Sequence, residues 1–89
     1  MIYGVHYAPM TPAQCRAARA LLEWSQRDLA ARARLSAGTV RSFEKGMTSL
    51  MANNAEAVAR AFEAAGVAFD LDAGTGPGVR MKEGGADAE

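Results

Sequence analysis

The 89-residue sequence is poor in cysteine and histidine, which build disulfide frameworks and many metal sites. It has one cysteine, Cys15, and one histidine, His6, so it offers neither an internal disulfide nor a CxxC metal site. No apolar run approaches the roughly 18 residues of a membrane-spanning helix, and residues 1–10 lack the basic start of a secretory signal. We therefore expect one small cytoplasmic domain that is not an enzyme and needs no cofactor, metal or membrane.

The sequence also lacks net charge, because ten acidic residues balance ten basic ones. The two kinds of charge are separated along the chain. Residues 16–45 carry seven basic and three acidic side chains, whereas residues 46–89 carry three basic and seven acidic ones. The balance argues against a uniformly basic nucleic-acid binder, but a polarised molecule can present its basic half to an anion. Solvated helix faces would give the same pattern.

Capping residues and apolar spacing predict four helices. Residues 1–9, which precede them, are expected to form an N-terminal arm or a short added strand. Thr11 followed by Pro12 is typical of a helix start, because proline is tolerated at the first helical position. We expect this helix to reach about Glu23. Its buried stripe is predicted to comprise Ala17, Leu21 and Trp24, widened by Ala18 and Leu22.

Two shorter helices follow, with a tight turn between them. Ser25, with Asp28 three residues later, resembles a capping box and begins a helix over residues 26–33. Ser36 caps the next helix, which is expected to reach Lys45. Two short helices joined in this way form a helix-turn-helix.

The fourth helix has the most regular amphipathic pattern. Asn53 or Asn54 is expected to cap it, with Glu56 three residues after Asn53, and Gly66 to end it. Its apolar positions are Ala55, Val58, Ala59, Phe62 and Ala65.

Alternating residues over 67–72 and 79–82 then predict a hairpin of two strands around a glycine-rich turn. An isolated hairpin is barely stable in water, so residues 67–82 need a partner, either a second copy of the chain or the N-terminal arm. Residues 83–89 are predicted to form a disordered tail. The predicted dimer interface comprises Val67, Phe69, Leu71 and Val79.

Residues 11–66 resemble the phage-repressor-like, or XRE-type, helix-turn-helix family. The residues that match the family pattern are Trp24, Ser25, Gln26, Leu29, Ala30, Leu35, Ser36, Thr39, Val40, Phe43, Glu44 and Gly46. The resemblance implies a mainly α fold: a four-helix lambda-repressor-like domain over residues 10–66, here followed by a β-hairpin. Arg34 departs from the pattern, because many relatives carry glycine in this turn. Either the turn is strained or it takes another geometry.

The resemblance also implies binding to double-stranded DNA through the helix at 36–45, here called the reading helix. An α-helix fits the major groove, and its N-terminal residues reach base edges. The predicted base-contacting residues are Ser36, Ala37, Gly38, Arg41 and Ser42. Arg41 is the only long donor among them, and we expect it to contact guanine; a phosphate contact or a solvated charge is the alternative.

Phosphate contacts are expected around the reading helix, with Gln26 and Thr39 assigned by the resemblance. A helix N-terminus suits an anion, although plain capping is the alternative for Gln26 and for the asparagines. The predicted phosphate-contacting residues are Gln26, Arg27, Arg34, Thr39, Lys45, Thr48, Asn53 and Asn54. Glu44 is expected instead to be structural and to pair with an arginine of the preceding helices.

Two functions fit this pattern. The first is a dimeric, nucleoid-associated regulator that reads a palindromic operator and represses by covering a promoter; activation through contact with RNA polymerase stays open. The second is a protein-interaction module, such as an antitoxin or a co-regulator, on the same fold. The basic excess in residues 16–45 favours DNA, whereas the small side chains of Ala37 and Gly38 favour the protein partner.

Overall fold

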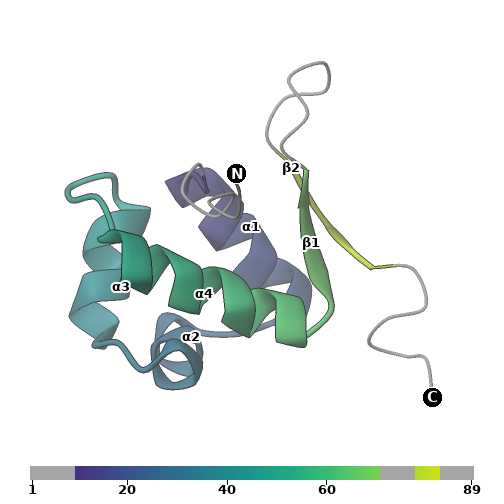
Figure 1. Ribbon diagram of the computed structural model, residues 1–89, viewed down its shortest axis with the longest axis horizontal. Coiled ribbons are helices and arrows are strands. Elements are labelled where there is room, and N and C mark those ends of the chain that lie inside the picture. The colour runs from purple at the N-terminus through teal and green to yellow at the C-terminus, as the bar shows by residue number, and fades with distance from the viewer. Residues whose placement is uncertain (1–9, 71–77, 83–89) are drawn as a thin grey trace.

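The computed structural model describes residues 10–70 and 78–82 of the chain (Figure 1). Its elements are α1 (Pro12–Leu22), α2 (Gln26–Ala33), α3 (Ala37–Glu44), α4 (Ala52–Ala64), β1 (Val67–Asp70) and β2 (Gly78–Met81). The predicted mainly α fold with a C-terminal hairpin is therefore confirmed. The expectations for the arm at 1–9, for Leu71 and for the tail at 83–89 lie outside the described residues.

Side-chain caps begin the first three helices, as predicted. Thr11 Oγ1 accepts the backbone N–H of Gln14 at 3.0 Å, while the Gln14 side chain accepts the N–H of Thr11. Ser25 and Asp28 form the same reciprocal pair at the start of α2. Ser36 caps α3 with its hydroxyl. These bonds satisfy backbone donors that have no acceptor inside a helix.

The fourth helix begins earlier than predicted. Its N-cap is Met51, which makes no side-chain cap, so neither Asn53 nor Asn54 caps α4. The N–H of Ala55 already donates to the carbonyl of Met51 at 2.8 Å, which places both asparagines inside the first turn. Glu56 does not complete a capping box, and pairs with the arginine four residues later.

The buried face of α1 differs from the predicted stripe. Its buried residues are Gln14, Cys15 and Ala18, whereas Ala17 is exposed and the Leu21 side chain is 45% exposed. The reason lies at the end of the helix. Because α1 stops at Leu22 and Glu23 takes the left-handed conformation, Trp24 leaves the helical stripe. The prediction for Ala17 and Leu21 is therefore wrong.

The core lies between α1, α2, α3 and α4 and is centred on Phe62. The largest fully buried side chains are Phe62, Leu29, Val40, Val58, Val67 and Cys15. The ring of Phe62 stacks on Trp24, with centroids 5.7 Å apart, and meets Phe69 of β1 edge-on at 5.8 Å. The guanidinium of Arg32 lies 4.4 Å from the centroid of the Trp24 ring. One aromatic cluster thus joins α2, α4 and the hairpin.

The hairpin packs against its own helices. β1 and β2 are antiparallel, with Val67 opposite Met81 and Phe69 opposite Val79. Because alternate residues of a strand share a face, these four side chains point the same way, and all pack in or against the core. Gln14 of α1 donates to a carbonyl at the start of β2 at 3.0 Å, and Figure 1 shows the hairpin beside α1 and the end of α4.

This packing corrects the predicted dimer interface. Val67 is fully buried within one chain, so it is not available to a second copy. Phe69 and Val79 lie on the same inward face and keep only partial exposure. The predicted partner of the hairpin was a second copy of the chain or the N-terminal arm, whereas in the structure the helical domain itself covers the hairpin's apolar face.

The turn between α2 and α3 takes the strained of the two expected geometries. Arg34 has φ 62° and ψ 45°, and Glu23 has φ 58° at the end of α1. Left-handed backbone is unfavourable for a residue with a Cβ. We expect Arg34→Gly to raise the free energy of unfolding by about 0.5–1 kcal/mol, because the greater freedom of glycine in the unfolded chain offsets part of the relief.

Urea denaturation measures this effect, and Glu23→Gly is the matched control. It relieves the same backbone conformation at a helix end where no DNA contact is predicted. Both variants are expected to gain stability, while only Arg34→Gly removes a predicted phosphate contact. A loss of stability in both would show that these turns are not strained.

Candidate nucleic-acid interface

Four of the five predicted base-contacting residues lie on the outer side of α3 or at its cap, whereas Ala37 packs against the core. Val40 and Phe43 point inward and are buried, which fixes the rotation of the helix. The outward side carries Ser36, Gly38, Arg41 and Ser42, while Ala37 is partly buried at its border with the core. The structure thus brings four of the five predicted residues together on one face of the reading helix.

The side chain of Arg41 runs back toward the start of α3. Its Nη1 atom would lie 3.9 Å from a Cβ placed on Gly38, and Ser36 Oγ would lie at the same distance. Gly38 does not have a positive φ, so its backbone does not require glycine. A helical glycine costs about 0.5–1 kcal/mol relative to alanine. Nothing in the described part of the chain needs that open space, which faces outward beside the Arg41 guanidinium.

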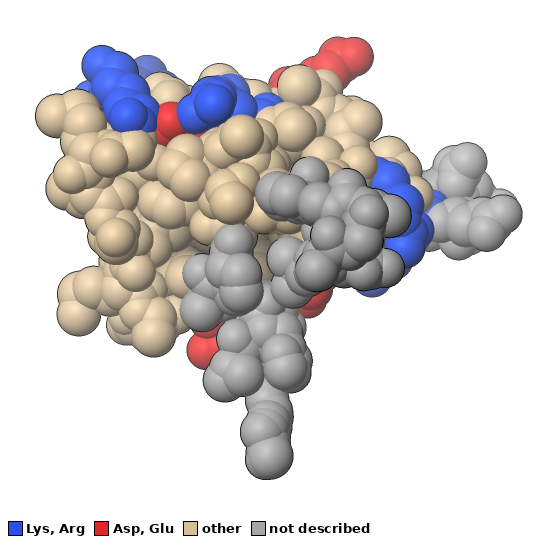
Figure 2. All heavy atoms as spheres, turned by 90° about the horizontal axis from the view of Figure 1, so that it is seen from above, with Lys and Arg blue, Asp and Glu red and all other residues tan. Residues whose placement is uncertain are grey.

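The predicted phosphate-contacting residues lie at the ends of α2, α3 and α4 and in the loops between them. Gln26, Thr39 and Asn54 are partly exposed, and Thr39 Oγ1 is already hydrogen-bonded to Ser36 Oγ at 2.9 Å. Those that are exposed are Arg27, Arg34, Lys45, Thr48 and Asn53. Figure 2 shows two groups of Lys and Arg side chains along its upper edge, with an acidic side chain between them, and a further basic group at its right side.

A buried carboxylate lies behind this face. Glu44, the last residue of α3, is 2% exposed. Arg19 of α1 donates two hydrogen bonds of 2.8 Å to this carboxylate, from Nε to Oε2 and from Nη2 to Oε1. Cys15 Sγ donates to Oε2 at 3.0 Å, and Gln26 Nε2 donates to Oε1 at 3.0 Å. Arg16 Nη1 donates to the backbone carbonyl of Glu44.

The expected pairing of Glu44 with an arginine of a preceding helix is confirmed. That arginine is Arg19 of α1, whose side chain is 20% exposed. The sequence analysis missed Cys15 and Gln26 as partners of Glu44. One signal was available: Glu44 follows Val40 by four residues and so shares the buried side of α3, where a charge needs partners.

The network sets the protonation of its two titratable acids. Burial opposes ionisation of Glu44, but hydrogen bonds from Arg19, Gln26 and Cys15 outweigh burial and hold the pKa of Glu44 below its ordinary value. Burial raises the pKa of the Cys15 thiol, and the Glu44 carboxylate raises it further. The thiol therefore stays protonated and serves as a hydrogen-bond donor, as a core residue and not a reactive one.

Stability should consequently fall in acid. Because the pKa of Glu44 is lower in the folded chain than its ordinary value of 4.5, ionised Glu44 stabilises the fold above about pH 4.5. That contribution is lost as the pH falls through the folded-state pKa. We expect Glu44→Gln to lower stability by about 1–3 kcal/mol at pH 7 and to flatten its dependence between about pH 5 and pH 3.

Thermal unfolding across this pH range measures the difference. The pKa of Asp28 is also lowered, by its bonds to the backbone and side chain of Ser25. Its effect on the pH dependence of stability is the same in the wild type and the variant, so it cancels in the comparison. An unchanged pH slope in the variant would show that Glu44 is not the group responsible.

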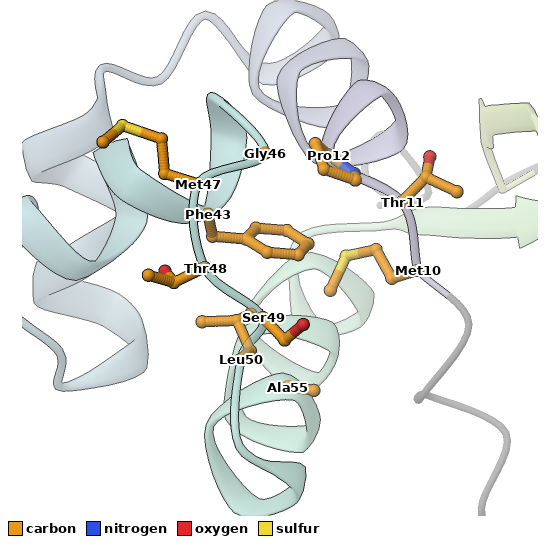
Figure 3. Close-up of a pocket in the computed structure, with 10 residues that line it drawn as sticks. All are labelled: Met10, Thr11, Pro12, Phe43, Gly46, Met47, Thr48, Ser49, Leu50 and Ala55. Carbon is orange, nitrogen blue, oxygen red and sulfur yellow. The ribbon is translucent and has the colours of Figure 1, made fainter.

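A groove of about 370 Å³ lies between the start of α1, the end of α3 and the loop at 46–51. In Figure 3 the ring of Phe43 points into it, and the side chains of Met47 and Met51 nearby are 70% and 71% exposed. The lining residues are Met10, Thr11, Pro12, Phe43, Gly46, Met47, Thr48, Ser49, Leu50 and Ala55. Because none of them is charged, the groove lacks the side chains of an acid–base centre.

Residues 10–70 and 78–82 contain no group of three His, Cys, Asp or Glu side chains placed to hold a metal ion. Of the helices in that part of the chain, none is long and apolar enough to cross a membrane.

A helix-turn-helix family model matches residues 16–64, which is more than half of the chain. The match begins within α1, ends with α4, and includes both helices of the motif and most of the Glu44 network. No curated protein matches the sequence. The residue pattern, the four-helix fold and the family match agree: the chain belongs to the XRE-type helix-turn-helix family of DNA-binding regulators.

Proposed function

We propose that the chain is a sequence-specific repressor that binds a palindromic operator as a homodimer, with α3 in the major groove. The observation that supports this most directly is the outer face of α3. There the Arg41 guanidinium lies back over Gly38, next to the capped start of the helix. The N-terminal residues of a reading helix are the ones that reach base edges, and arginine is the side chain best suited to guanine.

Contacts to the DNA backbone would position this helix. The exposed cations Arg27, Arg34 and Lys45 are proposed to contact phosphates. Gln26 and Thr39 are proposed for the same role at the starts of α2 and α3. Thr48, Asn53 and Asn54 would reach the backbone from the loop and first turn of α4; neither asparagine is used as a cap. The bound regulator would act on chromosomal DNA in the cytoplasm.

A dimer follows from the size of the reading surface. One module offers few base contacts, and two copies on half-sites about 34 Å apart would supply the missing affinity and specificity. The proposed contact uses the parts of the hairpin that its own helices leave open, including the partly exposed edges of Phe69 and Val79. Covering a promoter is the simplest action for this domain, and contact with RNA polymerase would instead give activation.

Selection of bound duplexes from a random DNA library tests the proposal, followed by gel shifts at two salt concentrations. We expect a palindromic site whose affinity falls at least about tenfold between roughly 50 and 200 mM salt. Sedimentation of the free protein measures whether it is a dimer. If no sequence is enriched and binding does not depend on salt, DNA binding is wrong and the protein-interaction module becomes the better function. The uncharged groove beside Met47 and Met51 favours that second function.

A further inference from the structure

The amide of Gln26 is held by a residue of the reading helix. Gln26 is the first residue of α2, and its Nε2 donates to Oε1 of Glu44 at 3.0 Å. A carboxylate only accepts hydrogen bonds, so only the NH₂ end of the amide can face it. The Gln26 carbonyl oxygen must therefore point away. The contact fixes the orientation of the amide as well as its position.

Glu44 is itself anchored from α1. Arg19 binds both of its carboxylate oxygens, and the Cys15 thiol binds Oε2. The side chains of Glu44 and Arg19 are 1% and 20% exposed, so the bonds between them are largely shielded from water. The amide of Gln26 is consequently held in place relative to α1 and α3, and not by α2 alone.

Gln26 also lies where backbone donors are free. The hydroxyl of Ser25 accepts the N–H of Asp28, the third residue of α2. The N–H groups of Gln26 and Arg27 have no acceptor within the helix. One amide N–H of Gln26 is used by Glu44, and no bond to the second is found among the described residues. This helix start thus carries two backbone donors and one side-chain donor, all suited to a phosphate.

We propose that Glu44 is a positioning residue for DNA binding. By holding one N–H of the Gln26 amide, it directs the other toward a phosphate that the start of α2 contacts. This inference rests on the proposed function, because it requires that the start of α2 meets DNA. Glu44, a buried carboxylate on the inner side of α3, would thus orient a phosphate-binding amide at the outer surface of α2.

A double-mutant cycle tests the role, with a fluorescein-labelled duplex of mixed sequence as the probe. Phosphate contacts carry no sequence information, so an operator is not needed. Gln26→Met keeps the length of the side chain but removes the amide, and is expected to weaken binding about tenfold. Glu44→Gln is expected to weaken binding similarly in the wild-type background and to have no further effect when residue 26 is methionine. If Glu44→Gln lowers the affinity equally with glutamine and with methionine at residue 26, its role is a general structural one and the proposal is overturned.

Further variants keep the test decisive. Glu23→Gln makes the same change of charge at an exposed helix end, and is expected to cause no loss of affinity. If Glu44→Gln does not fold, Glu44→Asp replaces it: the carboxylate keeps its charge next to Arg19 but is one methylene too short to hold the Gln26 amide. It is expected to bind as weakly as Gln26→Met, and wild-type affinity would overturn the proposal. Wild-type binding without salt dependence would instead refute DNA binding itself.

Discussion

Phe62→Ala is expected to lower the free energy of unfolding by about 3–5 kcal/mol, the range found when a buried aromatic ring is removed. Phe62 is completely buried, and its ring stacks on Trp24 and meets Phe69 edge-on. The substitution therefore opens a cavity and also removes the ring contact between Phe69 of the hairpin and α4. A domain of this size has about 5–10 kcal/mol of stability in total, so the substitution would remove a large fraction of it.

Urea denaturation followed by fluorescence measures the loss, because Trp24 is the only tryptophan in the chain and lies against this ring. Phe69→Ala is the matched control. Phe69 is partly exposed at one end of the same cluster, so its loss should be smaller, about 1–2 kcal/mol. If Phe62→Ala and Phe69→Ala lower the free energy of unfolding equally, the centre of the core lies nearer the hairpin than Phe62.

Arg41→Ala is expected to weaken operator binding by about 1–3 kcal/mol, which is about 5- to 150-fold in affinity. The loss should be concentrated at one base pair of each half-site, where discrimination against the wrong base should nearly vanish. The physical reason is that Arg41 is the only long donor on the outer face of α3, and a bidentate bond to guanine depends on its guanidinium.

Gel shifts with the selected operator and with single-base variants measure this effect. Lys45→Ala is the control, because an exposed lysine at the end of α3 is proposed to contact only phosphate. It should weaken all sequences alike and reduce the salt slope by about one. If Arg41→Ala weakens every sequence to the same extent, Arg41 contacts phosphate and does not read a base.

Features set by neighbouring residues could be predicted from the sequence. The caps at Thr11, Ser25 and Ser36 were predicted correctly, because each depends on hydrogen bonds that span three residues. The outward face of α3 was also predictable, since Val40 and Phe43 fix which side of an eight-residue helix is buried. The placement of the candidate base contacts on one surface followed from that rotation.

Features set by distant residues could not be predicted. Leu21 fits a helical stripe, but its exposure depends on where Glu23 turns the chain. Val67 fits a dimer interface, but the helices of its own chain cover it. Gln26 and Glu44 are 18 residues apart, and no local pattern connects an amide at one helix start with a carboxylate at the end of the next helix.

Specificity on this scaffold should be unusually easy to redesign. The start of α3 offers an open surface at residue 38, where an added Cβ would meet no atom closer than 3.9 Å. Replacing the glycine would favour the helix as well. Val40 and Phe43 hold the helix from its other side. The residues that hold the helix thus differ from Gly38 and Ser42, which are proposed to face the bases, so a library of variants at these two positions is expected to acquire new operators while the architecture stays unchanged.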